Sequence, residues 1–438
     1  MDDHSSWSGG AVLGDLIARG LVHDTTDPDL LRARLEDGPI TVYCGFDPTA
    51  ESLHVGNLVP LLLLRRFQLF GHRPIALAGG ATGMIGDPGG RSEERNLLDQ
   101  ATLDRNVMAI KHQLEQFLDF TPGPNQALLV DNREWTAPMG VLDFLRDVGK
   151  YVTVNTMLAK ESIRARVASE HGISFTEFSY MLLQANDFHW LYKHLNCEMQ
   201  VGGSDQWGNI TAGVDLIRRK EGVSVHALTV PLITKADGTK FGKTAAGAVW
   251  LDPDRTSPYD FFQYFVRCDD RDVERFLKQL TLLSLEEIAG IMARHEERPE
   301  ERFAQRRLAR EVTELVHGPV AASEAEHASS GFTRAVADLA PSELEALVDA
   351  MPTAHLARGD VLGVDVVELV ARIGLVGSKG EGRRLIAQAG LYMNDEALPE
   401  SRPLGPADVL HDRFVMLRRG KKQRYLVVID DEEPGSGS

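Results

Sequence analysis

Residues 39–88 read PITVYCGFDPTAESLHVGNLVPLLLLRRFQLFGHRPIALAGGATGMIGDP, and they decide the fold. Residues 39–45 are typical of a short buried strand, and residues 58–70 of a helix that Gly71 ends. Residues 74–78 read as a second strand, which runs into a glycine-rich turn. A strand, a helix and a strand in this order predict an α/β fold with an open parallel sheet, whose ligands bind beyond the carboxyl ends of the strands.

Two short segments, far apart in the chain, carry groups suited to binding phosphate. The segment LHVGN at 53–57 offers an imidazole, a carboxamide and an unhindered glycine backbone where the first strand leads into the helix. The segment KFGKT at 240–244 places Lys240 and Lys243 three residues apart on a polar loop. A histidine near a helix start is usually only a cap, and loop lysines are usually only solvated. Together, however, the two segments favour nucleotide chemistry.

The composition is that of a soluble globular protein. At 438 residues, with 43% hydrophobic and 25% charged residues, the chain should form roughly two to four domains. The longest strongly apolar run, residues 59–64, is far shorter than the roughly 20 residues of a membrane helix. Residues 1–10 lack the features of a secretory signal. Three cysteines without a C-x-x-C pair indicate a reducing cytoplasm and no structural metal.

The charge is unevenly distributed. A net charge of −17 argues against a polyanionic partner unless positive charge is gathered locally. Residues 365–424 carry eleven Lys and Arg against eight Asp and Glu. A basic carboxyl-terminal region on an otherwise acidic chain favours RNA binding there.

Three motifs follow one another along the chain: YCGFDPT at 43–49 with LHVGN at 53–57, then GGSDQWGNI at 202–210, then KFGKT at 240–244. In this order they closely resemble the signatures of bacterial tyrosyl-tRNA synthetases, a class I aminoacyl-tRNA synthetase family. The resemblance extends over essentially the whole ordered chain. Many class I enzymes have histidine where this chain has Asn57, whose amide can donate to a phosphate oxygen but cannot carry a proton.

By this resemblance the first two motifs bind ATP. It implies that His54 and Asn57 hydrogen-bond the phosphates, beside the unhindered backbone of Gly56. It places the other ATP-binding residues around the α-phosphate and the ribose: Gly45 and Asp47 near the α-phosphate, Cys44 near the ribose, Gly203 and Asp205 at the ribose hydroxyls, and Gln206 beside them. For Asp205, a carboxylate that caps its own loop is the alternative interpretation.

The lysine loop would supply catalytic cations. Carboxylate attack on the α-phosphate moves charge onto the leaving pyrophosphate, and Lys240 and Lys243 would stabilise that charge more in the transition state than in the ground state. Thr244 keeps the hydroxyl of the serine common in the class motif. Arg91 and Arg95 resemble a second cationic loop of the family, although for Arg95 an ordinary charge cluster at a helix start is an equally good explanation.

Tyrosine recognition is predicted on one helix face. Tyr180, Gln184 and Asp187 lie at i, i+4 and i+7 among apolar residues, where three hydrogen-bonding groups would be costly without a ligand. The resemblance implies that Tyr180, Gln184 and Asp87 hold the substrate ammonium, and that Asp187 and Tyr43 bind the phenol hydroxyl. Phenylalanine would leave these buried groups unpaired, a rejection for which tyrosyl-tRNA synthetases are themselves the known example.

The domain organisation follows from the same resemblance. We expect a Rossmann-like catalytic domain at 1–235 with a connective insertion at about 120–200, then the lysine loop, a helical domain and a linker at 236–360. Residues 364–429 resemble a small α+β S4 RNA-binding domain, and residues 430–438 should be a disordered tail. The candidate RNA-binding residues of the S4-like domain are Lys379, Arg383, Arg384, Arg418, Arg419, Lys421 and Lys422. A solvated charged face is the alternative explanation for them.

These features predict an enzyme that converts L-tyrosine and ATP to tyrosyl-adenylate and pyrophosphate, then transfers tyrosine to the 3′-terminal adenosine of tRNA(Tyr). The attacking carboxylate is already ionised, so no general base is needed, and Mg²⁺ would accompany the phosphates. The resemblance implies a cytoplasmic homodimer joined through the insertion. Tyr43, Asp187 and the S4-like domain disfavour a tryptophanyl enzyme. The presence of His54, Asp205 and both loop lysines disfavours a regulatory RNA-binding protein built on an inactive scaffold.

Overall fold

A computed structural model describes most of the chain, in two units. The described residues are 11–87, 98–160, 163–164, 167, 172–239, 241–244, 247–331, 336–345, 347–348, 351–420 and 423–430. The first unit comprises Met1–Asp252 and Cys268–Ala304, and the second comprises Pro253–Arg267 and Gln305–Ser438.

The first unit is built on a parallel sheet of five strands in the order β3-β2-β1-β4-β5. These strands are β1 (Thr41–Phe46), β2 (Arg73–Ala78), β3 (Leu128–Asp131), β4 (Cys197–Gly203) and β5 (His226–Val230). All four strand pairings are parallel, which confirms the predicted α/β fold. Strand β3 lies inside the stretch that we expected to be an insertion. It was not predicted, because four half-buried residues at a sheet edge carry too weak a hydrophobic pattern to be recognised.

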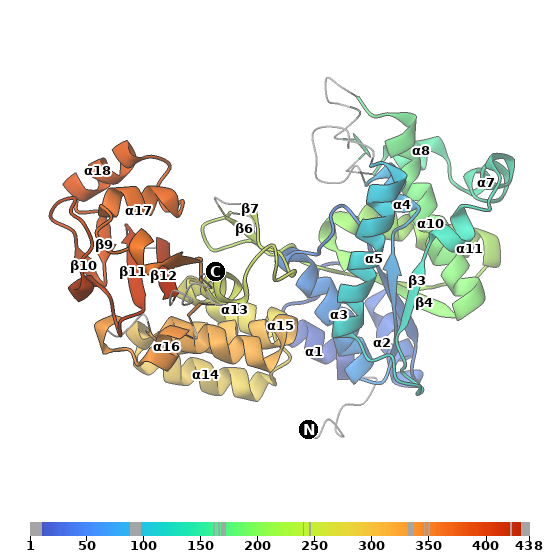
Figure 1. Ribbon diagram of the computed structural model, residues 1–438. Coiled ribbons are helices and arrows are strands. Elements are labelled where there is room, and N and C mark those ends of the chain that lie inside the picture. The colour runs from blue at the N-terminus through green and yellow to red at the C-terminus, as the bar shows by residue number, and fades with distance from the viewer. Residues whose placement is uncertain are drawn as a thin grey trace. The chain divides into compact units, whose positions relative to one another are not determined.

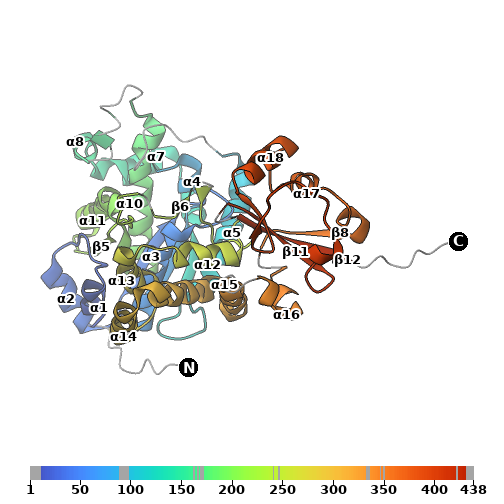
Figure 2. The same cartoon turned by 90° about the vertical axis from the view of Figure 1, so that its left-hand side faces the viewer.

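Helices cover both faces of this sheet (Figure 1). Because side chains alternate along a strand, neighbouring residues face opposite helices. Ala78 packs with Leu103 on the face covered by α3 (Leu58–Leu69) and α5 (Gln100–Phe117). Tyr43 packs with Phe188 on the other face, under α10 (Phe175–Leu195) and α11 (Trp207–Glu221), which lie side by side in Figure 2.

Helix α3 forms where the sequence predicts it. Gly71 follows its end with φ of 86°, a conformation that glycine adopts without strain. Pro60 is the third residue of the helix, where a missing N–H leaves no intrahelical bond unmade. The remaining helices of the first unit are α1 (Val12–Ala18), α2 (Pro28–Asp37), α4 (Thr82–Ile85), α6 (Arg133–Thr136), α7 (Val141–Asp147), α8 (Val154–Leu158), α13 (Asp270–Leu280) and α14 (Leu285–Glu297).

The second unit contains another five-stranded sheet, in the order β10-β9-β11-β12-β8. Its strands are β8 (Thr353–Ala357), β9 (Leu391–Met393), β10 (Glu396–Ala397), β11 (Phe414–Arg419) and β12 (Gln423–Asp430). The described α-helices of this unit are α12 (Pro258–Val266), α15 (Phe303–Gly331, beginning in the first unit), α16 (Pro341–Glu345), α17 (Val366–Arg372) and α18 (Lys379–Ala387). Strand β8 lies before the boundary expected at residue 364 and pairs with β12, so the sheet begins earlier than the basic region does.

Two apolar layers sandwich this second sheet. On one face Leu417 and Val427 pack with Val370 of α17 and Ile386 of α18. On the other face Phe414, Met416, Leu426 and Val428 pack with residues that precede the sheet, among them Leu339 and Leu344. The long helix α15 is interrupted at Gly318, whose φ is 85°, directly before Pro319.

Among the described residues, no helix has both the length and the apolar composition that crossing a membrane would require.

We predict that Leu417→Ala lowers the free energy of unfolding of the second unit by about 3 kcal/mol, because the fully buried side chain would leave a cavity in its core. Val320→Ala in the same unit is the control; this side chain is 69% exposed and should change stability by less than about 0.5 kcal/mol. Urea denaturation followed by circular dichroism measures both. Equal effects of the two substitutions would contradict the packing described.

Candidate active site

The candidate site lies at the carboxyl ends of β1 and β4. These strands are neighbours although the chain reaches β4 only after β2 and β3, so the strand order reverses between them. Such a switch point is where open parallel sheets bind ligands. Asp47 follows the end of β1, and the segment from Ser204 to Gln206 follows the end of β4. The fold therefore brings the first and second motifs to one edge of the sheet.

His54 begins the short turn of 3₁₀ helix Val55–Asn57. Its Nδ1 accepts a hydrogen bond from the Gly56 N–H at 3.0 Å, and its own N–H donates to Asn57 Oδ1 at 3.1 Å. His54 and Gly56 are nevertheless exposed. A Cβ at Gly56 would lie 2.8 Å from His54 Cε1, so the ring can fold over this position only because residue 56 is glycine.

Residues 249–251, which follow the lysine loop, are hydrogen-bonded directly to the first motif. The Val55 N–H donates to the Val249 carbonyl at 3.0 Å, and the Leu251 N–H donates to the Leu53 carbonyl at 2.9 Å. The Val249 N–H in turn donates to the Gly242 carbonyl at 3.0 Å. A Cβ at Gly242, whose φ is 78°, would lie 2.7 Å from Val55 Cγ2. Segments almost 200 residues apart in the sequence are thus in contact.

Several predicted cations cannot be placed. Arg91, Arg95 and Lys240 lie outside the described residues, as do the side chains of Lys243 and Thr244. The backbone of the last two forms β6 (Lys243–Thr244), which pairs with β7 (Gly247–Ala248).

Asp187 is a buried carboxylate held by two donors. It is 2% exposed. It accepts hydrogen bonds from Asn132 Nδ2 at 2.9 Å and from Trp135 Nε1 at 2.8 Å. Burial raises its pKa to about 7, against the effect of both donors. The Trp135 ring stacks on Trp190, with centroids 4.2 Å apart. Sequence analysis missed Asn132 and Trp135, because neither lies near a motif in the chain.

Tyr43 presents a buried hydroxyl toward this region. The residue is 1% exposed, and among the described residues its hydroxyl has no hydrogen-bond partner. Gln200, paired with Tyr43 across β1 and β4, also has a buried side-chain oxygen with no partner among the described residues. Burial, with Asp187 as a further cause, raises the pKa of Tyr43 well above its usual value. A ligand with hydrogen-bonding groups at this place would satisfy both atoms.

Asp47 accepts hydrogen bonds from two side chains on different helices. The Tyr180 hydroxyl donates to Asp47 Oδ2 at 2.8 Å, and the Thr82 hydroxyl donates to Asp47 Oδ1 at 2.9 Å. Burial, and then the charge of Asp47, raises the pKa of Tyr180 well above its usual value, so this phenol stays a donor. A Cβ at Gly79 would lie 2.4 Å from Asp47 Oδ1, which explains glycine at that position.

Gln206 of the second motif hydrogen-bonds Asp87, another predicted site residue. Its Nε2 donates to Asp87 Oδ2 at 2.6 Å, and Asn209 Nδ2 lies 3.4 Å from Asp87 Oδ1. Asp205 is exposed next to this pair, and its pKa is raised, first by partial desolvation and then by the charge of Asp87. At Gly203 a Cβ would lie 2.6 Å from Asp205 Oδ1. Sequence analysis missed Asn209, although it belongs to the quoted motif.

Three other predicted residues lie near these groups in the chain. Gln184 is half-buried on α10, and Gly45 is exposed near the end of β1. The Cys44 thiol is buried, which raises its pKa to about 12 and keeps it neutral. Its expected position beside a ribose stays a prediction.

The candidate RNA-binding residues of the second unit fall into two groups. Arg383 and Arg384 are exposed on α18 and form no ion pair with the residues that the structure describes. Three others contact neighbouring side chains: Lys379 forms an ion pair with Glu368 at 3.1 Å, Arg419 forms one with Glu381 at 2.7 Å, and the Arg418 guanidinium lies 3.6 Å from the centroid of the Tyr392 ring. Lys421 and Lys422 lie outside the described residues.

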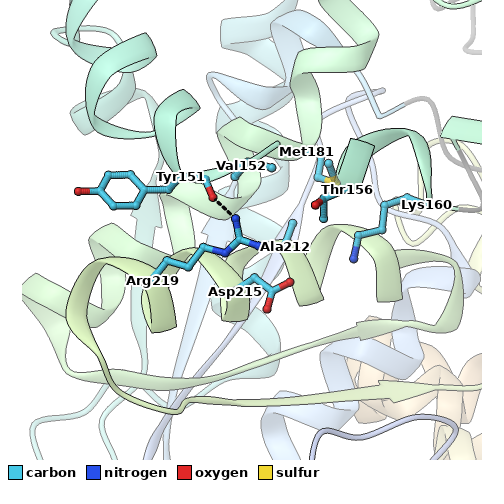
Figure 3. A pocket seen from close by; sticks show the side chains of 8 residues that line it. All are labelled: Tyr151, Val152, Thr156, Lys160, Met181, Ala212, Asp215 and Arg219. Atoms are coloured by element: carbon cyan, nitrogen blue, oxygen red, sulfur yellow. Dashed lines mark hydrogen bonds between the residues drawn. The ribbon is translucent and has the colours of Figure 1, made fainter. Parts of the chain in front are cut away.

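A small hollow in the first unit contains none of the predicted site residues (Figure 3). Lys160 beside it donates to Thr211 Oγ1 at 2.8 Å, and Arg219 donates to the Tyr151 carbonyl. The space, about 10 Å³, is no larger than one water needs, so it does not hold a substrate. Among the described residues, no group of three or more His, Cys, Asp or Glu could hold a metal ion.

Comparisons with known proteins identify the family. The model for class I tRNA synthetases (W and Y) matches residues 35–333, and the model for the tyrosine–tRNA ligase SYY-like C-terminal domain matches residues 343–428. The tyrosine–tRNA ligase of Opitutus terrae is 53% identical over 422 residues, covering 95% of this chain and 99% of that protein. The tyrosine–tRNA ligase of Geobacillus stearothermophilus is 49% identical over 419 residues, with the same coverage.

A solved structure also resembles the chain. The C-terminally truncated mitochondrial tyrosyl-tRNA synthetase of Aspergillus nidulans has a TM-score of 0.68 and 32% sequence identity, covering 73% of this chain and 94% of that one. The parallel sheet, the buried polar groups at its switch point and these likenesses lead to one conclusion. The chain belongs to the tyrosine–tRNA ligases, within the class I tRNA synthetases.

Proposed function

We propose that tyrosine and ATP react in the crevice at the carboxyl ends of β1 and β4. The observation that carries this proposal is the backbone pairing of Leu53 and Val55 with residues 249–251, which follow the lysine loop. This pairing supports a single phosphate-binding site made from His54, Asn57 and the loop. The tyrosine carboxylate attacks the α-phosphorus of ATP, tyrosyl-adenylate forms, and pyrophosphate leaves.

In this proposal, catalysis is alignment with electrostatic stabilisation. The attacking carboxylate is ionised at neutral pH, so no group of the enzyme has to remove a proton from it. Imidazole, amide and ammonium donors face the charge that grows on pyrophosphate, and they stabilise the transition state most. Mg²⁺ would enter with ATP, bound to its phosphate oxygens, since the described residues offer no acidic cluster of their own.

Tyrosine would be selected by buried groups that only its hydroxyl satisfies. The unpartnered Tyr43 hydroxyl and the Asp187 carboxylate support a site for a phenol O–H. Tyr180, Gln184 and Asp87 would bind the ammonium group, with Asp47 fixing the orientation of Tyr180. A substrate without the hydroxyl would leave the buried Tyr43 hydroxyl without a partner and the buried Asp187 carboxylate without the further donor that a phenol supplies.

We further propose that the tyrosyl group passes to the terminal adenosine of tRNA(Tyr), which the second unit helps to bind. The exposed Arg383 and Arg384 support this role, because phosphate binding needs cations that internal acids do not already neutralise.

A homodimer in the cytoplasm completes the proposal. Its interface would use an apolar surface in the insertion that monomeric proteins rarely expose. The large apolar residues that support it are more than half exposed: Val141, Leu142, Leu145, Val154 and Phe175.

We predict that Lys240→Ala combined with Lys243→Ala slows tyrosine-dependent exchange of labelled pyrophosphate into ATP at least about 100-fold, because two cations act on the leaving group. Tyrosine binding, measured by equilibrium dialysis, should change less than about twofold, since no loop lysine is assigned to tyrosine. Exchange at the rate of the unmodified enzyme would show that the loop has been misassigned.

Tyr43→Phe should reduce the preference for tyrosine over phenylalanine by about tenfold, because it removes one of the groups that phenylalanine leaves unpaired. The ratio of kcat/KM for the two amino acids in pyrophosphate exchange measures this preference. Tyr192→Phe, on the same face of the sheet but outside the proposed site, is the matched control. An unchanged ratio in Tyr43→Phe would contradict its role in recognition.

Arg383→Gln combined with Arg384→Gln should lower kcat/KM for tRNA in aminoacylation by about tenfold and leave pyrophosphate exchange unchanged, because lost phosphate contacts weaken only tRNA binding. Arg413→Gln, which removes an arginine already paired with Glu345, is the control. Equal losses of aminoacylation and exchange would count against an RNA-binding role.

A further inference from the structure

Helix α13 holds the segment that leads into the lysine loop. The Ala236 N–H donates to Asp272 Oδ2 at 2.8 Å, and Arg275 donates both to the Thr234 carbonyl and to Asp272 Oδ1. Asp272 is only 3% exposed. One buried carboxylate and its arginine thus bind the backbone at two positions of this segment.

The same helix also contacts the loop beyond the segment. Phe241, inside the KFGKT motif, packs edge-on against Phe276 with ring centroids 4.9 Å apart, and both side chains are buried. The segment closes on itself as well, because the Lys235 N–H donates to the Thr239 carbonyl at 2.9 Å and the Phe241 N–H lies 3.4 Å from the Ile233 carbonyl. Residues on both sides of Lys240 are therefore anchored to α13 or to one another.

The other end of α13 is fixed by two buried arginines. Arg66 donates to the carbonyls of Thr281 and Lys278, and Arg19 donates to those of Leu283 and Lys278. These carbonyls lie at the negative end of the helix, where a cation is stabilised. Arg66 belongs to α3, the helix that begins directly after His54 and Asn57. The first motif therefore leads into α3, the lysine loop is held by α13, and Arg66 joins the two helices.

We propose that Asp272, Arg275 and Phe276 are positioning residues for adenylate formation, acting through the loop lysines. This inference rests on the proposed function, since it matters only if those lysines act on pyrophosphate. A flexible cation contributes to a transition state only when its attachment fixes where it can reach, and a displacement of about 1 Å is costly. Without the Asp272 carboxylate, the Ala236 N–H loses its acceptor and Arg275 keeps only the Thr234 carbonyl, so the base of the loop is held less firmly.

A double-mutant cycle on the full-length enzyme tests this inference. Asp272→Ala should lower kcat of pyrophosphate exchange by about tenfold, the effect of one lost charge-assisted hydrogen bond, without changing the affinity for tyrosine. In a Lys243→Ala background the same substitution should cost less than about threefold, because the group through which Asp272 acts is partly gone. Asp272→Asn, which keeps an oxygen for the Ala236 N–H, should retain more activity than Asp272→Ala.

The control is Asp269→Ala, which removes the N-cap of the same helix but no contact to the loop. It should lower thermal stability by an amount similar to Asp272→Ala, and it should leave exchange within about twofold of the unmodified enzyme. The inference is overturned if the Asp272 and Lys243 effects multiply, or if Asp269→Ala is as damaging as Asp272→Ala. Full exchange in Lys243→Ala alone would instead overturn the assignment of the lysine to pyrophosphate, and this inference with it.

Discussion

The backbone hydrogen bonds between Leu53, Val55 and the segment of residues 249–251 are the constraint on which the rest of the site depends. They use main-chain groups, so they fix the distance between two motifs without regard to the side chains at those positions. Gly242 and Gly56 remove the Cβ atoms that would push the two segments apart or displace the His54 ring. In the proposed function, a triphosphate bound at this point would meet donors from both the first motif and the lysine loop.

The amino-acid side of the site depends on a different device, a connected set of buried polar side chains. The Asn132 amide donates hydrogen bonds to Asp187 and to the Thr82 hydroxyl. The carboxylate of Asp47 accepts hydrogen bonds from the hydroxyls of Thr82 and Tyr180. Each side chain fixes the orientation of the next. Because the local dielectric constant is low, leaving any of these groups unpaired costs more free energy than it would in water. In the proposed function the same energetic cost would give selectivity for tyrosine, because a phenol hydroxyl can supply the partner that the Tyr43 hydroxyl lacks among the described residues.

The two units also divide the electrostatic work. An acidic chain would repel RNA over most of its surface, whereas the candidate RNA-binding residues described in the second unit lie on α18 and β11. Internal ion pairs neutralise some of them, as Glu368 and Glu381 do for Lys379 and Arg419. Counting charges in the sequence therefore overstates how many cations are available to a polyanion.

The sequence by itself determined the α/β class, the helix that follows the first motif, and the family, because these depend on local periodicity and on contiguous motifs. The Rossmann-like domain predicted at residues 1–235 was inferred without β3 or β4, and the four residues of β3 are too few to show a period. Local patterns also gave no sign of Asn132, Trp135 or Asp272, which are ordinary polar and aromatic residues in unremarked segments.

Only the tertiary structure decided which of these residues meet. Asp187 finds its donors more than 50 residues earlier in the chain, and Ala236 finds its acceptor 36 residues later. Such contacts arise when helices pack on a sheet and bring distant positions within hydrogen-bonding distance. No spacing rule along the chain encodes them, because the packing of whole elements, and not the neighbours of each residue, sets the distance.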